Sequence, residues 1–135
     1  MDTDDWDEAM YLKELTKPIP TNIYLTIERI LNWAEERNIL EGSLPKDQLA
    51  KLMQELGEVS DALCKHDTVL LKKEIGDMLV VLAILADMFQ LTLPECAEAA
   101  YEKIKHRRGV MFDGVFIKET DDEYPEILRK LSMQK

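Results

Sequence analysis

Residues 45–89 read PKDQLAKLMQELGEVSDALCKHDTVLLKKEIGDMLVVLAILADMF, and their periodicity predicts two long helices joined by a short turn. The first helix begins at Pro45, a residue suited to the first turn of a helix, and runs to about Cys64. Its apolar residues recur at helical spacing and predict one buried stripe: Leu49, Leu52, Met53, Leu56, Val59 and Leu63. The turn of residues 65–67 makes the two helices an antiparallel pair, and Asp67 is suited to cap the second one.

The second helix, residues 68–89, is apolar on all sides over its second half, because Met78 to Ala86 includes no polar residue. Such a helix lies buried between neighbours or in a subunit interface. One chain of this length has few helices to surround it, and large exposed apolar patches are uncommon on monomers. We therefore expect an obligate oligomer, a homodimer or homotetramer.

Helical periodicity continues on the N-terminal side of this pair. A helix is expected from a cap at Thr21 to about Asn38, and residues 38–43, with Gly42, form the turn that ends it. Its apolar face consists of Ile23, Ile27, Ile30, Leu31 and Ala34. Residues 1–21 form a peripheral segment in which a short helix is expected at residues 7–15.

On the C-terminal side, Thr92 to Glu95 has the spacing of a capping box and opens a fourth helix that reaches about Arg108 and ends at Gly109. Apolar residues flank Asp113-Gly114, which predicts a two-residue hairpin. Residues 119–135 form a peripheral tail with an amphipathic helix from Tyr124 to Met133. The predicted fold class is all-α, a bundle of four to five helices with a short β-hairpin after the fourth helix.

Composition narrows the class of protein further. The 135 residues include 17 Lys+Arg and 27 Asp+Glu, a formal net charge of −10. This length predicts a single domain over residues 1–135. The acidic charge argues against a nucleic acid polymer or an anionic membrane as partner, because both need a basic surface.

The chain is expected to be cytoplasmic. Its first five residues include three aspartates where a signal peptide is basic, and the longest apolar run is half of the roughly 18 residues that a membrane span needs. Cys64 and Cys96 form no disulfide framework and are read as small apolar side chains in a reduced protein.

One acidic pattern occurs twice, as Glu55-Leu56-Gly57-Glu58 and as Glu74-Ile75-Gly76-Asp77. Each copy places two carboxylates three residues apart on one side of a helix. An antiparallel helix pair can bring all four into one cluster, where they repel each other unless cations lie among them. Hard oxygen ligands suit Mg²⁺ or Mn²⁺, which also hold substrate phosphates.

The glycine inside each acidic pair is a second signal. A helical glycine costs roughly 1 kcal/mol against alanine, so its presence suggests a close approach of two backbones. The alternative interpretation of both acidic pairs is an ordinary solvated helix face. A di-iron carboxylate site is excluded, because neither His66 nor His106 has a glutamate three residues before it.

The ordered set of acidic pairs in a four-helix pattern resembles the MazG-like all-α nucleoside triphosphate pyrophosphohydrolases. The similarity runs from about Ile23 to Glu119 and includes the basic segment Lys103 to Gly109. The resemblance implies hydrolysis of an NTP or dNTP to the monophosphate and pyrophosphate, with Mg²⁺ bound by the four acidic residues. It also implies a dimer or tetramer with the active site near the subunit interface.

The resemblance further assigns substrate contacts. Lys103 and Arg107 match positions that contact phosphate in related enzymes, and their spacing of four residues places both on one side of the predicted helix. Trp33 matches an aromatic residue that lies against the base, although a tryptophan with apolar neighbours is also a common core residue.

One position departs from the family pattern. Many relatives carry an extra glutamate, a candidate general base, where this chain has Gln54. The proton of the attacking water would then be accepted by Glu55 or Glu58, or the nucleophile would be a metal-bound hydroxide. Two other functions stay open at this point: a phosphoribosyl-ATP pyrophosphohydrolase, and a non-catalytic helical interaction protein that needs no divalent ion.

Overall fold

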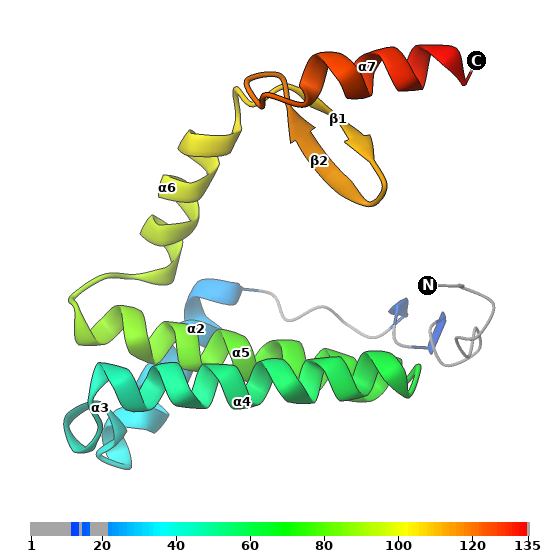
Figure 1. Cartoon of the computed structure of the whole chain (residues 1–135). Coiled ribbons are helices and arrows are strands. Elements are labelled where there is room, and N and C mark those ends of the chain that lie inside the picture. The colour runs from blue at the N-terminus through cyan, green and yellow to red at the C-terminus, as the bar shows by residue number, and fades with distance from the viewer. Residues whose placement is uncertain (1–11, 14, 17–21, 135) are drawn as a thin grey trace. The chain divides into compact units, whose positions relative to one another are not determined.

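The computed structural model describes residues 12, 13, 15, 16 and 22–134. It divides into two compact units, Met1–Pro94 and Glu95–Lys135, each of which is described by itself. The described chain is mostly helical and has a short antiparallel hairpin after helix α6 (Leu93–Ile104), so the predicted fold class is confirmed (Figure 1). The single domain over residues 1–135 stays a prediction. The short helix expected at residues 7–15 lies for the most part outside the described residues.

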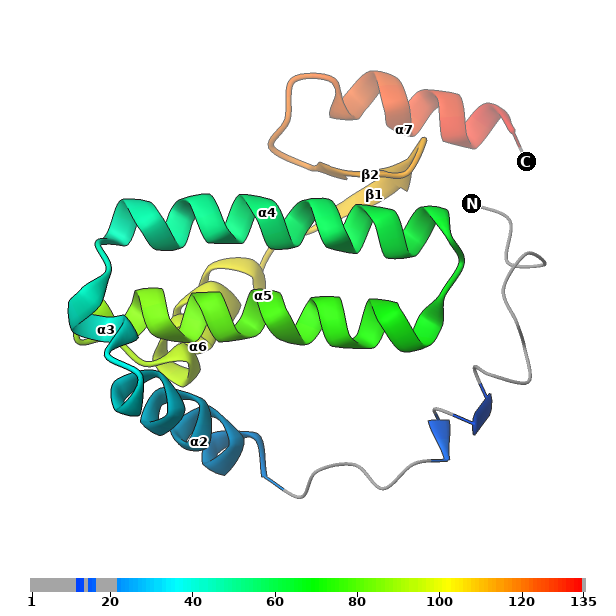
Figure 2. The same ribbon diagram turned by 90° about the horizontal axis from the view of Figure 1, so that it is seen from below.

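The first unit is built on the antiparallel pair α4 (Pro45–Cys64) and α5 (Thr68–Met88). These helices run side by side, and α2 (Ile23–Glu36) also packs against α5 (Figure 2). The buried apolar residues of this unit are Ile27, Ala34, Ala62, Val81, Ala83, Ile84 and Ala86. Most of them belong to α5, so the most apolar helix of the sequence is the central one.

Local signals set the bounds of the central pair as predicted. Pro45 occupies the first turn of α4, and α4 ends at Cys64. The Asp67 side chain accepts a hydrogen bond of 3.0 Å from the backbone N–H of Leu70 and caps α5.

The segment before α4 differs from the prediction. Asn22 caps α2 in place of Thr21, since its side chain accepts a hydrogen bond of 2.9 Å from the backbone N–H of Tyr24. Helix α2 ends at Glu36, and a one-turn helix, α3 (Ile39–Gly42), stands where only a turn was expected. Asn38 separates the two helices with a φ of 58°, a left-handed conformation that asparagine tolerates.

The buried face of α4 agrees only in part with the prediction, because Leu52, Val59 and Leu63 are half-buried and the other three residues of the stripe are exposed. Its buried residues are Gln48, Glu55 and Ala62, which recur every seven residues as on a helix that meets one neighbour along a seam. Three residues of the predicted stripe are instead 54%, 67% and 56% exposed: Leu49, Met53 and Leu56. The position of α5 decides which side of α4 is covered, and it covers the side with the acidic residue.

The second unit contains strands β1 (Gly109–Phe112) and β2 (Val115–Lys118), which pair antiparallel with Phe112 opposite Val115. Asp113 and Gly114 have φ values of 49° and 77°, the left-handed pair of a two-residue hairpin, so this prediction is confirmed. Helix α7 (Tyr124–Met133), also predicted, packs against β1.

Helix α6 (Leu93–Ile104) is shorter than predicted, because it ends four residues before Arg108. Gly109 does not end this helix but begins β1, opposite Lys118. A Cβ at Gly109 would lie 2.1 Å from the carbonyl oxygen of Ile117, so the close approach of β1 and β2 at this position requires a glycine. Because Gly109 pairs with β2, the chain leaves the helical conformation before the residue at which the sequence pattern predicts the end of the helix.

Within the described part of the chain, no single helix is both long and apolar enough to cross a bilayer. Helices α5 and α6 reach that length and composition only when they are taken together across the bend between them.

Candidate metal centre

Helices α4 and α5 bring together four acidic side chains, which we call the carboxylate cluster: Glu55, Glu58, Glu74 and Asp77. Each offers one carboxylate oxygen, and these four atoms lie within 4.8 Å of one another. The two residues from each helix are three positions apart, so they project from one side of that helix. The antiparallel contact between α4 and α5 then sets the two pairs against each other.

The carboxylate cluster extends from the interior to the surface of the first unit. Glu55 is 5% exposed, Glu58 and Glu74 are half-buried, and Asp77 is exposed. A ligand can therefore reach the cluster from the side of Asp77, while Glu55 closes its inner end.

Two oxygens of the cluster lack a partner within the described structure. Glu55 Oε2 and Glu74 Oε2 are buried and have no hydrogen-bond donor there. An unsatisfied buried polar atom destabilises a fold, and a bound cation is one way to satisfy such carboxylate oxygens. Lys51 Nζ lies 3.3 Å from Glu55 Oε1 and supplies one positive charge against four carboxylates. The donor set is hard oxygen only and fits a divalent cation, which these four residues could hold.

The surroundings of Glu74 raise the pKa of its side chain. Partial burial of its carboxyl raises the pKa of Glu74 above its usual value, and hydrogen bonding and charge repulsion from Glu58 and then Asp77 raise it further. A cation at the cluster would reverse this effect, because it would favour the ionised form of all four groups.

The glycines between the acidic residues do not mark a close backbone approach, which corrects the expectation from the sequence. A Cβ added at Gly57 or at Gly76 meets nothing within 4 Å. A Cβ at either position would face open space, so the packing of α4 on α5 does not require a glycine there.

A cavity of about 490 Å³ opens beside the cluster, between α2 and α5. Its lining consists of Thr26, Arg29, Ile30, Trp33, Asp77 and Val80. Trp33 is 43% exposed, so it is not a core residue, and it shares the cavity with a member of the carboxylate cluster. The guanidinium of Arg37 lies 5.1 Å from the centre of the Trp33 ring and covers the ring by a cation–π contact.

Three residues of the site were not singled out from the sequence. Thr26 and Arg29 line the cavity, and Lys51 pairs with Glu55. A signal was present for two of them: Arg29 stands four residues before Trp33, and Lys51 stands four residues before Glu55, each on the same side of its helix.

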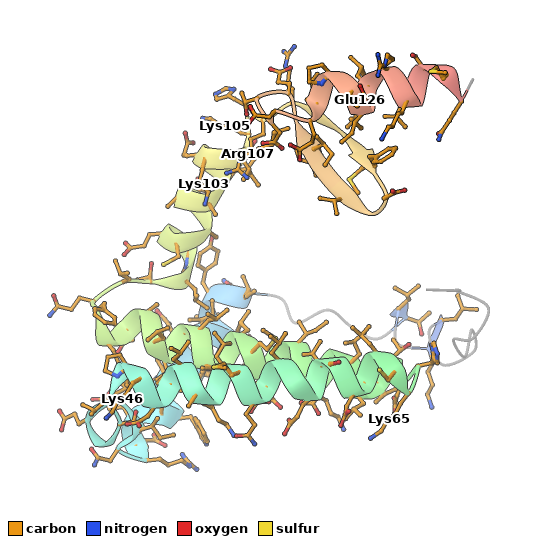
Figure 3. The ribbon with its side chains drawn as sticks, in the orientation of Figure 1. Lys46, Lys65, Lys103, Lys105, Arg107 and Glu126 are labelled. Carbon is orange, nitrogen blue, oxygen red and sulfur yellow. The ribbon has the colours of Figure 1, made fainter. Side chains whose placement is uncertain are left out.

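The predicted phosphate contacts Lys103 and Arg107 lie in the second unit (Figure 3). Lys103 is in the last turn of α6, but Arg107 follows the end of that helix, where its backbone N–H bonds to the carbonyl of Ile104 at 2.9 Å. The argument that helical spacing places both on one side is therefore wrong. Their role toward phosphate stays a prediction.

The remaining polar candidates are not members of the carboxylate cluster. Gln54 is exposed, and its side-chain oxygen accepts a hydrogen bond of 3.5 Å from Lys51 Nζ. His66 adopts a left-handed conformation, with a φ of 52°, in the turn between α4 and α5. His106 follows α6 in the second unit.

Residues 45–112, half of the chain, match the MazG nucleotide pyrophosphohydrolase domain family. An uncharacterized 18.2 kDa protein in the rep-hol intergenic region of Haemophilus phage HP1 (strain HP1c1) is 45% identical over 60 residues, which cover 44% of this chain and 37% of the phage protein. The match thus spans less than two thirds of that relative. No solved structure matches.

The matched residues 45–112 include all four members of the carboxylate cluster and both helices that carry them. The acidic pairs thus lie within the matched domain. The chain belongs to the MazG nucleotide pyrophosphohydrolase domain family.

Proposed function

We propose that this protein is a Mg²⁺-dependent pyrophosphohydrolase that cleaves an NTP or dNTP to the monophosphate and pyrophosphate. The observation that carries the proposal is the carboxylate cluster, with two buried oxygens that lack a partner among the described residues, within a domain of this family. A solvated helix face would leave each carboxylate in water and would not bury Glu55.

Glu55, Glu58, Glu74 and Asp77 would hold the metal ion. When bound there, Mg²⁺ (or Mn²⁺) supplies polarisation of phosphate oxygens and a more acidic water. Glu55 is tied to Lys51 and anchors the inner end of the cluster. Asp77 belongs both to the cluster and to the cavity, so it connects the metal ligands with the space for a nucleotide.

The amide of Gln54 cannot take a proton at neutral pH, which leaves a metal-bound hydroxide or a carboxylate on α4 as the proton acceptor. Glu58 is the better candidate of the two carboxylates on α4. It is half-buried and accessible, whereas Glu55 is 5% exposed and paired with Lys51. In the second unit, Lys103 and Arg107 are proposed to neutralise the phosphate chain, so that pyrophosphate leaves after attack at the α-phosphorus.

The test is a panel of NTPs, dNTPs and phosphoribosyl-ATP with Mg²⁺, in which pyrophosphate, diphosphate and orthophosphate are measured separately. We expect pyrophosphate and a nucleoside monophosphate, and loss of turnover in Asp77→Asn. The matched control is Asp61→Asn, because Asp61 is an exposed aspartate of α4 outside the cluster.

Three other results of this substrate panel would contradict part or all of the proposed function. Cleavage of phosphoribosyl-ATP alone would favour the related pyrophosphohydrolase. The products diphosphate and orthophosphate would contradict the assignment of the cleaved bond. If no substrate turned over and Mg²⁺ did not stabilise the fold, the chain would be a helical interaction protein.

We also propose that a second copy of this chain is its partner. Helix α4 exposes an apolar stripe at Leu49, Met53 and Leu56. Helix α5 and its C-cap residue expose three apolar side chains seven positions apart: Ile75, Leu82 and the C-cap Phe89 are 55%, 40% and 60% exposed. Burial of such stripes in a self-complementary dimer would remove them from water.

A further inference from the structure

Arg29 is a cation in the same cavity as Asp77 of the carboxylate cluster. We propose that the Arg29 guanidinium binds a phosphate oxygen of the nucleotide in this cavity, an inference that rests on the proposed function. It differs from the assignment of Lys103 and Arg107, because Arg29 lies within the same compact unit as the cluster.

The guanidinium of Arg29 is hydrogen-bonded to a neighbouring side chain of the same helix. Arg29 Nη2 donates a hydrogen bond of 3.1 Å to Thr26 Oγ1, and that hydroxyl donates one of 3.2 Å to the carbonyl of Asn22. Thr26 also lines the cavity. An arginine has five N–H donors, and within the described residues Thr26 is the hydrogen-bond acceptor for this one. Donors are therefore left for a ligand.

The lining of the cavity indicates what kind of ligand group Arg29 meets. Ile30, Trp33 and Val80 form an apolar set suited to a base, and Thr26, Arg29 and Asp77 form a polar set. Asp77 links the polar set to the residues proposed to hold the metal, and metal ions of this type hold phosphates. The planar fork of arginine matches phosphate oxygens, so the polar set favours phosphate over base.

Charge balance leads to the same assignment. A nucleoside triphosphate carries several negative charges, and the cavity that it must enter already contains the carboxylate of Asp77, beside the three other acidic residues of the cluster. Lys51 is engaged with Glu55 at the inner end of the cluster. A cation that lines the cavity offsets the repulsion where the phosphates would lie, and Arg29 is placed to do this.

The experiment measures binding of inorganic tripolyphosphate, which has phosphates but no base, by calorimetry in the presence of Mg²⁺. We expect Arg29→Ala to weaken this binding about tenfold or more, the usual effect of losing a charge-assisted hydrogen bond. Arg29→Lys should retain part of it, because the charge remains and the fork is lost. The control is Lys46→Ala, which removes an exposed cation of α4 away from the cavity and should bind as the wild type does.

The inference is overturned if Arg29→Ala binds tripolyphosphate like the wild type, or if the wild type does not bind it at all. An Arg29 variant that keeps its affinity for tripolyphosphate but changes its preference among bases would show that Arg29 contacts the base and not the phosphate. Should Arg29→Ala not fold, Arg29→Gln takes its place, with helical content as the check. Pyrophosphate release by the wild type separates the two proposals: if it occurs and Arg29 variants are unaffected, only the inference fails.

Discussion

At the scale of a single residue, Glu74 predicts how the metal-free protein responds to pH. Burial and the neighbouring Glu58 raise the pKa of Glu74 in the folded state above its value in the unfolded chain. Between these two pKa values the folded state holds a proton that the unfolded state has lost, so the free energy of unfolding falls as pH rises through this window. Glu74→Gln removes the effect. In EDTA at pH 7 we expect a higher Tm for Glu74→Gln than for the wild type.

The same comparison at about pH 4, near the ordinary pKa of a glutamate, should show a smaller difference, because Glu74 is then largely protonated in the wild type too. Mg²⁺ should reverse the order at pH 7, since the wild type gains more from the ligand. Glu41→Gln, an exposed glutamate of α3, is the control. A Tm difference that does not change with pH, or a less stable Glu74→Gln in EDTA, would contradict this account.

At the scale of an element, two glycines predict opposite effects of the same substitution. Gly57 lies inside α4 with nothing within 4 Å of an added Cβ, so Gly57→Ala should stabilise the fold by about 0.5–1 kcal/mol. Gly109 lies in β1, where a Cβ would stand 2.1 Å from the Ile117 carbonyl oxygen, so Gly109→Ala should destabilise the hairpin. Urea denaturation followed by circular dichroism measures the first change, and protease sensitivity of the second unit measures the second. If Gly57→Ala lowered stability, a contact at α4 beyond this chain would be indicated.

At the scale of the whole molecule, the exposed stripes of α4 and α5 predict a dimer in solution. Light scattering should return about twice the chain mass of 15.6 kDa at micromolar concentration. Leu56→Glu places a charge in the α4 stripe and should shift the mass toward that of one chain. Leu128→Glu is the matched control, because Leu128 is a 45% exposed leucine of α7 outside both stripes. A wild type of about 16 kDa would rule out the proposed partner.

The candidate site could be predicted in part. Glu55 with Glu58 and Glu74 with Asp77 are each local pairs within one helix. A short turn favours an antiparallel arrangement of the two helices, so the sequence could predict that the four carboxylates meet. Arg29 and Thr26 did not, because they come from α2, and the packing of α2 on α5 depends on contacts between residues some fifty positions apart.

The sequence by itself determined the elements whose signals are local: α4 from Pro45, α5 from its Asp67 cap, and the hairpin at Asp113-Gly114. Caps, prolines and turn residues act through hydrogen bonds and dihedral angles within a few positions, so they can be read without the fold. Only the tertiary structure decided which side of α4 is buried and where α6 stops. The pairing of Gly109 with β2 overrode helical periodicity, and the seam with α5 buried Glu55 while it left Leu56 in solvent, because burial depends on where the neighbouring element lies.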